Sequence, residues 1–277
     1  MKPSLTTIIP NLPTIQCVDV GANPIDGQAP YLPLLQKNIA EVIGFEPDAK
    51  ALAVLNQQKS NLETYLPFAV GDGNNHTFHR CQAPGMSSLL KPNKETLSYF
   101  HGFPEWGKVL ETSPIETYRL DDLEAVKSID YLKIDIQGGE LMVFQNGQQK
   151  LRDTLVIHTE VEFLPMYEGQ PLFAEVELFL RGLGFIFHKF EPLVSRVVKP
   201  LMLRNNPYAG LSQQVWADAI FIKNFMQLDA LSNDALLKYA VILHDIYGSY
   251  DIVLRALLAY DERQLTSYSQ VYASKIL

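Results

Sequence analysis

Short apolar runs alternate with segments of helical periodicity along most of the chain, and this alternation restricts the fold more than any other sequence feature. It is typical of βαβ units, in which parallel strands are joined by helices that cover both faces of the sheet. The predicted strands are 14–20, 41–45, 64–70, 129–134, 155–161, 184–190 and 215–222. The sequence therefore predicts a doubly wound α/β fold with a mostly parallel, seven-stranded sheet, the last two strands being candidates for an antiparallel pair.

Helices are expected between these strands, and one segment fits neither pattern. Helices are predicted over 31–40, from Pro47 onward, and from Pro171 to Gly184. Residues 74–114 are predicted to be irregular. The aromatic side chains of this part of the chain are Phe78, Tyr99, Phe100, Phe103 and Trp106. They form either a wall over a substrate or an ordinary packing contact with the sheet.

From residue 226 the character of the chain changes, because no further strand is predicted. Ser232 is a candidate N-cap of one helix, Gly248 ends it, and a second helix follows. We therefore expect a domain over 1–225 and a C-terminal helical extension over 226–277. The apolar stripes of the extension serve either a packed core or a contact with a partner, such as a second copy of the chain.

Composition excludes several classes of function. The formal net charge is −8 and no segment concentrates Lys and Arg, which argues against a nucleic-acid partner. No stretch approaches the ~18 apolar residues of a membrane span, and no signal-peptide pattern opens the chain. We therefore expect a cytoplasmic protein. Cys17 and Cys81 offer neither a disulfide framework nor metal-ligand spacing.

Polar side chains cluster where the predicted strands end. They are Asp19 with Gly21 and Asn23, then Glu46, Asp72, Asp135, His158 and Glu160. Ligands of open parallel sheets bind beyond the carboxyl ends of the strands, so these residues are predicted to share a site.

The first of these loops does not fit a dinucleotide. A pyrophosphate site needs the pattern G-x-G-x-x-G, but Gly21 is followed by Ala22 and Asn23, and Asp19 would place a negative charge near the phosphates. A cofactor with an ammonium group and a sulfonium suits that carboxylate better.

The next two loops extend this interpretation. Glu46 can accept hydrogen bonds from both hydroxyls of a ribose, and Asp72 can accept one from an adenine amino group. Simpler roles stay open: turn geometry for Gly21 and Asp72, and a helix N-terminal charge for Glu46.

Eight segments of the chain resemble FkbM-type methyltransferases. They are VDVGANPIDG (18–27), IGFEPD (43–48), AVGD (69–72), GMSSL (85–89), YRLDDL (118–123), IDYLKIDIQGGELMVFQNG (129–147), HTEVEFLPMYEGQPLF (158–173) and WADAIFIK (216–223). The resemblance covers about 14–223, and LKIDxxGxE is its most specific part. It implies a class I methyltransferase fold, S-adenosylmethionine as donor and, usually, O-methylation of a sugar or natural-product hydroxyl.

The resemblance also implies roles by position. The methionine end of the cofactor would be held by the loop Asp19, Gly21, Ala22 and Asn23, the ribose by Glu46, the adenine side by Asp72, and Asp135 would lie near the transferring methyl. Ser87 and Ser88 also belong to the segments that resemble the family, and they either contact a ligand or form a turn. Two departures are the residue Gln137, where members commonly carry Glu, and the segment 24–26, where many have a shorter, glycine-bearing turn.

Methyl transfer to a hydroxyl also needs a group that takes the proton. His158 and Glu160 share one face of a predicted strand beside that of Asp135. A histidine has the better unperturbed pKa for a base near neutral pH, which favours His158, and a hydrogen bond within the sheet is its alternative role. Glu160 either orients His158 or joins Asp135 around a divalent metal, which two carboxylates alone do not establish.

Two other functions stay open at this point. A nicotinamide-dependent oxidoreductase shares the fold class but lacks the glycine pattern. A non-catalytic nucleotide-binding or scaffold module would keep the Gly21 loop without needing the catalytic residues. The expected partner is a small-molecule or glycan acceptor, and a sugar hydroxyl, a polyketide hydroxyl and a lipid-linked glycan fit equally well.

Overall fold

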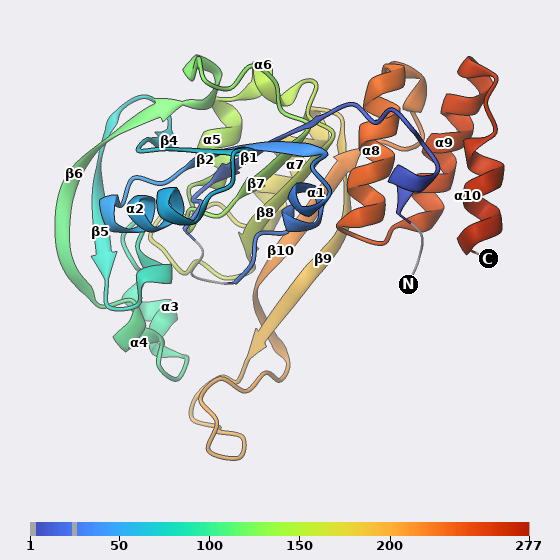
Figure 1. The fold of residues 1–277 in the computed structure, drawn as a ribbon. Helices are drawn as coiled ribbons and strands as arrows, with labels where there is room; N and C mark the ends of the chain where they lie inside the picture. The colour runs from blue at the N-terminus through green and yellow to red at the C-terminus, as the bar shows by residue number, and fades with distance from the viewer. Residues whose placement is uncertain (1–3, 24–26, 277) are drawn as a thin grey trace.

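The rest of the fold is arranged around one large sheet. The structure is a computed structural model that describes residues 4–23 and 27–276. The seven strands of the sheet lie in the order β3-β2-β1-β7-β8-β10-β9 (Figure 1). Their bounds are β1 Ile15–Val20, β2 Ala40–Phe45, β3 Glu63–Leu66, β7 Tyr131–Ile134, β8 Val156–Glu162, β9 Phe185–Arg196 and β10 Gln213–Lys223.

The strand order reverses between β1 and β7. The chain proceeds from β1 through β2 to β3 at one edge, then returns to place β7 on the other side of β1 and β8 beyond it. These five strands are parallel, whereas β10 is antiparallel to both β8 and β9. The class I methyltransferase fold and the antiparallel pair are thus confirmed, and the switch point of the sheet lies between β1 and β7.

A second, three-stranded sheet corrects two predictions. It has the order β4-β6-β5, with bounds β4 Ala69–Gly71, β5 Asn75–Cys81 and β6 Val109–Arg119. The predicted strand 64–70 is two strands in two sheets, separated at Pro67, which has no backbone N–H to donate. The segment 74–114 is not irregular. It escaped prediction because β5 and β6 bury few side chains, so their sequence lacks the apolar alternation of a half-buried strand.

Helices cover both faces of the large sheet. Their bounds are α1 Leu32–Gln36, α2 Ala49–Gln58, α3 Lys94–Ser98, α4 Phe103–Trp106, α5 Glu140–Gln145, α6 Gln148–Leu151 and α7 Phe173–Gly182. Four short 3-10 turns are η1 Leu5–Thr7, η2 Pro84–Met86, η3 Leu120–Asp122 and η4 Leu228–Ala230. Adjacent strand residues face opposite ways. Cys17 therefore shares a buried cluster with Leu34 of α1, and Val18 shares another with Val143 of α5 and Leu180 of α7.

Local sequence explains where two of these helices begin or end. The carboxylate of Asp48 accepts hydrogen bonds from the backbone N–H groups of Lys50 and Ala51 and so begins α2. Helix α1 is shorter than the predicted 31–40 because Asn38 has a left-handed backbone, with φ at 54°.

The C-terminal helices complete one face of the sheet. They are α8 Asn233–Asp245, α9 Tyr250–Gln264 and α10 Tyr268–Ile276, the last of which the sequence did not predict. Ser232 caps α8 as expected, accepting from the N–H of Ala235 at 3.2 Å. Leu236 of α8 and Val253 of α9 belong to the same buried cluster as Ile15 of β1. Of the two roles expected for the extension, core packing is therefore present, while self-association and the domain boundary at 225/226 stay predictions.

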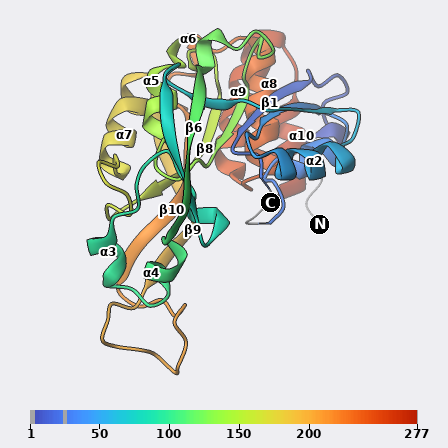
Figure 2. The same ribbon diagram turned by 90° about the vertical axis from the view of Figure 1, so that its left-hand side faces the viewer.

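The β9–β10 hairpin extends beyond the rest of the sheet. Residues 197–212 connect the two strands and project from the body of the molecule (Figures 1 and 2). Trp216, near the start of β10, pairs with Glu162 at the end of β8, so this connection leaves from the edge where the parallel strands end. Within the described ranges 4–23 and 27–276, no helix combines the length and the hydrophobicity needed to cross a membrane.

Candidate functional site

A cavity of about 930 Å³ lies where β1, β2 and β7 end. The strand-end residues in its lining include Gly21, Asn23, Glu46 and Asp135. Other lining residues come from the small sheet, among them Phe78 of β5 and Ser113 of β6. The cavity therefore occupies the switch point, where doubly wound folds bind their ligands.

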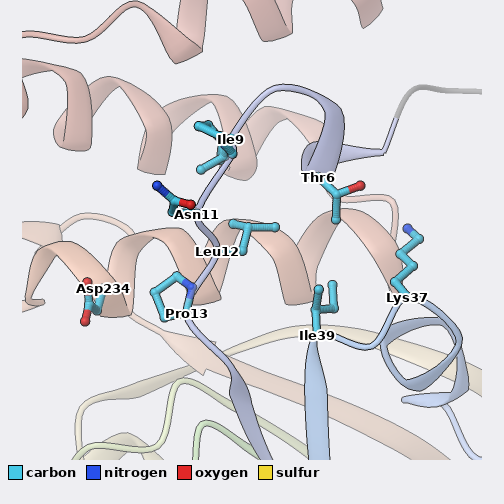
Figure 3. A pocket seen from close by; sticks show the side chains of 9 residues that line it. Thr6, Ile9, Asn11, Leu12, Pro13, Lys37, Ile39 and Asp234 are labelled. Atoms are coloured by element: carbon cyan, nitrogen blue, oxygen red, sulfur yellow. The ribbon is translucent and has the colours of Figure 1, made fainter.

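A second cavity, of about 630 Å³, lies at the opposite edge of the sheet (Figure 3). Its lining includes Pro13, two residues before β1, Ile39, directly before β2, and Asp234 of α8. The ammonium group of Lys37 in its lining is paired at 2.6 Å with Asp245. Its position at the amino ends of the strands makes it the poorer candidate.

Gly21 allows the ends of β1 and β7 to meet. Its φ is +79°, and a Cβ at this position would lie 2.1 Å from the carbonyl oxygen of Asp135. The N–H groups of Gly21 and Ala22 both donate to the carbonyl of Phe45 at 3.1 Å, which ties the loop to β2. Asn23 lines the cavity, whereas Ala22 packs in a small buried cluster away from the lining. The unusual segment 24–26 lies outside the described residues.

Asp19 lies in the wall behind this loop. It is buried, and its Oδ2 accepts a 2.7 Å hydrogen bond from the hydroxyl of Tyr31. Its Oδ1 has no hydrogen-bond partner among the described residues and lies 3.5 Å from the ammonium nitrogen of Lys133. Asp19 thus lies beside the cavity and is not part of its lining.

Lys133 is a site residue to which the sequence analysis assigned no role. Its ammonium group donates to the carbonyl of Gly21 at 3.2 Å and lies 4.0 Å from the Asp135 carboxylate. Burial opposes its charge, but the surrounding carboxylates, led by Asp19 and Asp135, raise its pKa above the ordinary lysine value. The available signal was a cation among the apolar residues of the segment 131–134.

Glu46 is held at the end of β2 by backbone groups. Its Oε1 accepts a 2.7 Å hydrogen bond from the N–H of Asp48, and the backbone of Asn23 also bonds to its carboxylate. Burial raises the pKa of Glu46 by more than these hydrogen bonds lower it. The residue lines the cavity, as the sequence predicted.

Asp72 lies apart from the other predicted site residues. Its carboxylate accepts from the backbone and side chain of Asn74, each at 3.0 Å, and lies 2.7 Å from Nε2 of His76. These hydrogen bonds outweigh the desolvation that acts against them and lower its pKa. Ala69 and Val70 of β4 line the cavity in its place. The structure shows the turn role of Asp72, not a contact with the site.

Gln137 joins two of the predicted catalytic residues. Its side-chain nitrogen donates to Asp135 at 2.8 Å and to Glu160 at 2.7 Å. The hydroxyl of Tyr167 donates to its side-chain oxygen at 2.9 Å, and the hydroxyl of Ser88 donates to its backbone carbonyl at 2.7 Å. Its backbone is left-handed, with φ at 62°. Both ends of the amide are thus engaged, and the strained backbone is held by its neighbours.

Two carboxyl groups near Gln137, those of Glu160 and Glu140, have raised pKa values. Burial, together with Asp135 and Glu162, raises the pKa of Glu160 well above its ordinary value. Burial also raises the pKa of Glu140 to about 7 although this group accepts from the N–H groups of Ile136 and Gly138. No group of three or more His, Cys, Asp or Glu side chains among the described residues is placed to hold a metal ion.

His158 is committed on both ring nitrogens. Its Nδ1 lies 3.0 Å from the hydroxyl of Tyr247 and 3.3 Å from that of Tyr131, and its Nε2 lies 3.1 Å from Asp218. The ring is buried and is not part of the cavity lining. It shares a strand face with Glu160 as predicted, but its carboxylate partner is Asp218. The expectation that Glu160 orients His158 is therefore wrong.

The remaining candidates divide between the cavity and the core. Phe78, Ser87 and Ser88 line the cavity. Phe100 and Phe103 are instead buried in a separate cluster with partly buried Trp106, and Tyr99 is exposed. Packing, rather than a wall over the substrate, is thus the observed role of Phe100, Phe103 and Trp106.

Comparison with known proteins identifies the family. The pattern described as the methyltransferase FkbM domain matches residues 19–187, more than half of the chain. The 2-O-methyltransferase NoeI of Sinorhizobium fredii is 31% identical over 174 residues, which are 58% of this chain and 69% of that protein.

Two solved methyltransferases are similar at greater distance. The magnesium protoporphyrin IX methyltransferase of Synechocystis PCC 6803, with bound SAM, matches 78% of this chain and 73% of its own at 11% identity and a TM-score of 0.40. The precorrin-6y C5,15-methyltransferase of Geobacter metallireducens matches 78% of this chain and 84% of its own, at 11% identity and a TM-score of 0.39. The extent of the domain match decides the assignment: this chain belongs to the FkbM family of S-adenosylmethionine-dependent methyltransferases.

Proposed function

We propose that this S-adenosylmethionine-dependent methyltransferase methylates a hydroxyl group of a sugar, glycan or natural-product acceptor. The observation that carries the proposal is the cavity at the switch point, whose lining includes Gly21, Glu46, Asp135 and Gln137. The 31% identity to a 2-O-methyltransferase supports oxygen as the acceptor atom.

The residues of this cavity fit the donor. Gly21 and Asn23 line the cavity at the end of β1. The carboxylate of Asp19 lies behind this loop, and its Oδ1 has no hydrogen-bond partner among the described residues. Glu46 presents a carboxylate at the end of β2, where it can accept from ribose hydroxyls. We assign Asp19, Gly21 and Asn23 to the methionine end and Glu46 to the ribose. When bound, the donor supplies an electrophilic methyl group on a sulfonium.

Asp135 is the residue best placed to meet the acceptor. It lines the cavity, Gln137 fixes its Oδ1, and Lys133 lies 4.0 Å from its Oδ2. In the proposal, Asp135 orients the acceptor hydroxyl and takes its proton, and the cation of Lys133 stabilises the charge around it. Holding a nucleophile in line with the methyl group can supply ~7 kcal/mol or more, so a modest base suffices.

The cofactor assignment is tested by calorimetric titration with S-adenosylmethionine, S-adenosylhomocysteine and NAD. We expect the first two to bind and NAD not to bind. Glu46→Gln should weaken binding about tenfold or more, the loss of one hydrogen bond to a charged group. Asp72→Asn is the matched control and should bind like the wild type, because its carboxylate faces Asn74 and His76. Binding of NAD alone would overturn the assignment.

The acceptor atom needs a separate experiment. Transfer of an isotopically labelled methyl group to a panel of oligosaccharides and hydroxylated natural products, followed by NMR of the product, locates the new bond. A methyl ether is the expected product. Methylation only at nitrogen, carbon or a carboxyl group would refute O-methylation of a hydroxyl while leaving the family membership intact.

A further inference from the structure

Exposed apolar side chains gather on the projecting end of the β9–β10 hairpin, residues 193–211, which we call the tip (Figures 1 and 2). Its exposed large hydrophobic residues are Leu193, Val198, Leu201, Met202, Tyr208 and Leu211. They are 41% to 58% exposed. Exposed apolar side chains gathered on one projecting segment mark a contact with another partner.

The tip is also positively charged in an acidic protein. Residues 192–217 contain Arg196, Lys199 and Arg204 but neither Asp nor Glu, whereas the whole chain carries a formal net charge of −8. The tip therefore combines apolar side chains with cations, and the negative charge lies elsewhere in the molecule.

Contacts with the α3–α4 segment hold the tip in place. The N–H of Lys199 donates to the carbonyl of Tyr99 at 2.9 Å, and its ammonium group donates to the carbonyl of Ser98 at 2.9 Å. The rings of Tyr208 and Trp106 stack with their centres 5.3 Å apart. The tip is thus anchored to the body through Lys199 and Tyr208.

The tip lies at the carboxyl ends of the parallel strands, as does the candidate site. The hairpin leaves the sheet where Trp216 pairs with Glu162, and Glu162 is two residues beyond Glu160, which binds Gln137. Whatever the tip binds is therefore brought to the edge at which the cavity lies.

We infer that the tip docks on an anionic phospholipid surface. Leu201, Met202 and their apolar neighbours would enter the interface, and Lys199 and Arg204 would meet the phosphate groups, as in other peripheral proteins. A twofold contact between two tips would instead bring their cations together, which disfavours a second copy as the occupant. Docking would orient the acidic remainder of the chain away from the membrane and bring the cavity to acceptors carried there.

Vesicle sedimentation tests this inference. The full chain should sediment with vesicles of phosphatidylcholine and phosphatidylglycerol but weakly with phosphatidylcholine alone, and added salt should reduce binding. The double variant Leu201→Ser/Met202→Ser should lose about tenfold or more of the binding, given two lost apolar contacts. Lys199→Gln/Arg204→Gln should abolish the preference for anionic vesicles. Leu178→Ser, an exposed leucine on α7, is the matched control and should bind normally.

Several results would overturn the docking surface. The first is that the wild-type protein does not sediment with vesicles, and the second is that Leu178→Ser loses as much vesicle binding as Leu201→Ser/Met202→Ser. The third is that no vesicles bind and sedimentation velocity shows a dimer that the double variant abolishes. Titration with S-adenosylhomocysteine runs in parallel and should be unaffected by all tip variants. A failure of lipid binding is thus distinguished from a failure of the proposed methyl transfer.

Discussion

A Cβ atom on Gly21 would lie 2.1 Å from the carbonyl oxygen of Asp135, so β1 and β7 can end side by side only because residue 21 is glycine. The same contact places the first loop against the residue proposed to receive the acceptor. The two halves of the candidate site are therefore joined through backbone atoms, without an intervening side chain.

Gly21→Ala should consequently abolish cofactor binding. The added methyl group forces the strand ends apart, so we expect at least ~100-fold weaker S-adenosylhomocysteine binding, about 3 kcal/mol. Gly184→Ala is the control: Gly184 also has a positive φ, +86°, but nothing lies within 4 Å of its missing Cβ. It should cost only the ~1–2 kcal/mol of a left-handed non-glycine residue in thermal unfolding. Equal effects of the two substitutions on binding would contradict the steric argument.

Variants of Gln137 should show whether this residue positions the carboxylates of Asp135 and Glu160 or only stabilises the fold. Gln137→Met removes both donors to the carboxylates and should lower kcat about tenfold or more, with little change in the KM of the donor. Gln137→Glu places a third carboxyl beside Asp135 and Glu160. Repulsion between like charges then raises their pKa values and moves the acidic limb of the pH–kcat profile to higher pH. Activity losses that merely follow the unfolded fraction, with an unchanged profile, would rule out the positioning role.

Glu140 should make the protein less stable as pH rises. Its pKa is raised from 4.5 to about 7 in the folded protein. Between these values the native state binds a proton that the unfolded chain has released, so stability falls as pH rises through this window. The contribution is roughly 3 kcal/mol at ~1.4 kcal/mol per pKa unit.

Glu140→Gln tests this linkage. It keeps an oxygen for the N–H groups of Ile136 and Gly138 but cannot titrate. Urea unfolding from about pH 5 to about pH 8 should therefore show a shallower decline in the variant than in the wild type. Glu95→Gln, on the exposed surface of α3, serves as control and should retain the wild-type slope. A slope unchanged by Glu140→Gln would contradict the assignment.

His158→Ala distinguishes a base from a structural histidine. The sequence predicts lower turnover with cofactor binding nearly intact, and the contacts of the ring add a stability cost. Loss of the hydrogen bonds to Tyr247 and Asp218 should reduce the unfolding free energy by about 1–3 kcal/mol. We expect kcat per folded molecule to fall by less than about tenfold, below the usual contribution of a general base. A loss of ~100-fold without destabilisation would restore His158 as the base.

The elements predicted best from the sequence are those whose pattern lies in residues adjacent along the chain. The strands β1, β7 and β8 are mostly buried on both faces, and each contains enough apolar residues to be recognised without knowledge of the fold. Helix α10 was missed because Tyr268–Ile276 exposes most of its surface and has only a weak apolar stripe. The strands β5 and β6 were missed for the related reason that neither face is well buried.

The same distinction between local and distant signals applies to the residues of the candidate site. Gly21, Glu46 and Asp135 could be found because each follows a recognisable strand. The links between Gln137 and Glu160, and between His158 and Asp218, join side chains from different strands or loops, and no local spacing encodes them. Asp72 shows the converse: its strand-end position suggested a ligand contact, but its immediate neighbours bind its carboxylate.

The packing of α9 on β1 has a consequence for biosynthesis. Ile15 and Cys17 of β1 share a buried cluster with Val253 and Leu257 of α9, more than 200 residues later in the chain. This face of the nascent sheet therefore stays incompletely covered until α9 has been made. A nascent chain that stops before α8 would present this apolar face to chaperones and proteases, because domains fold as they emerge only when their core partners are already made.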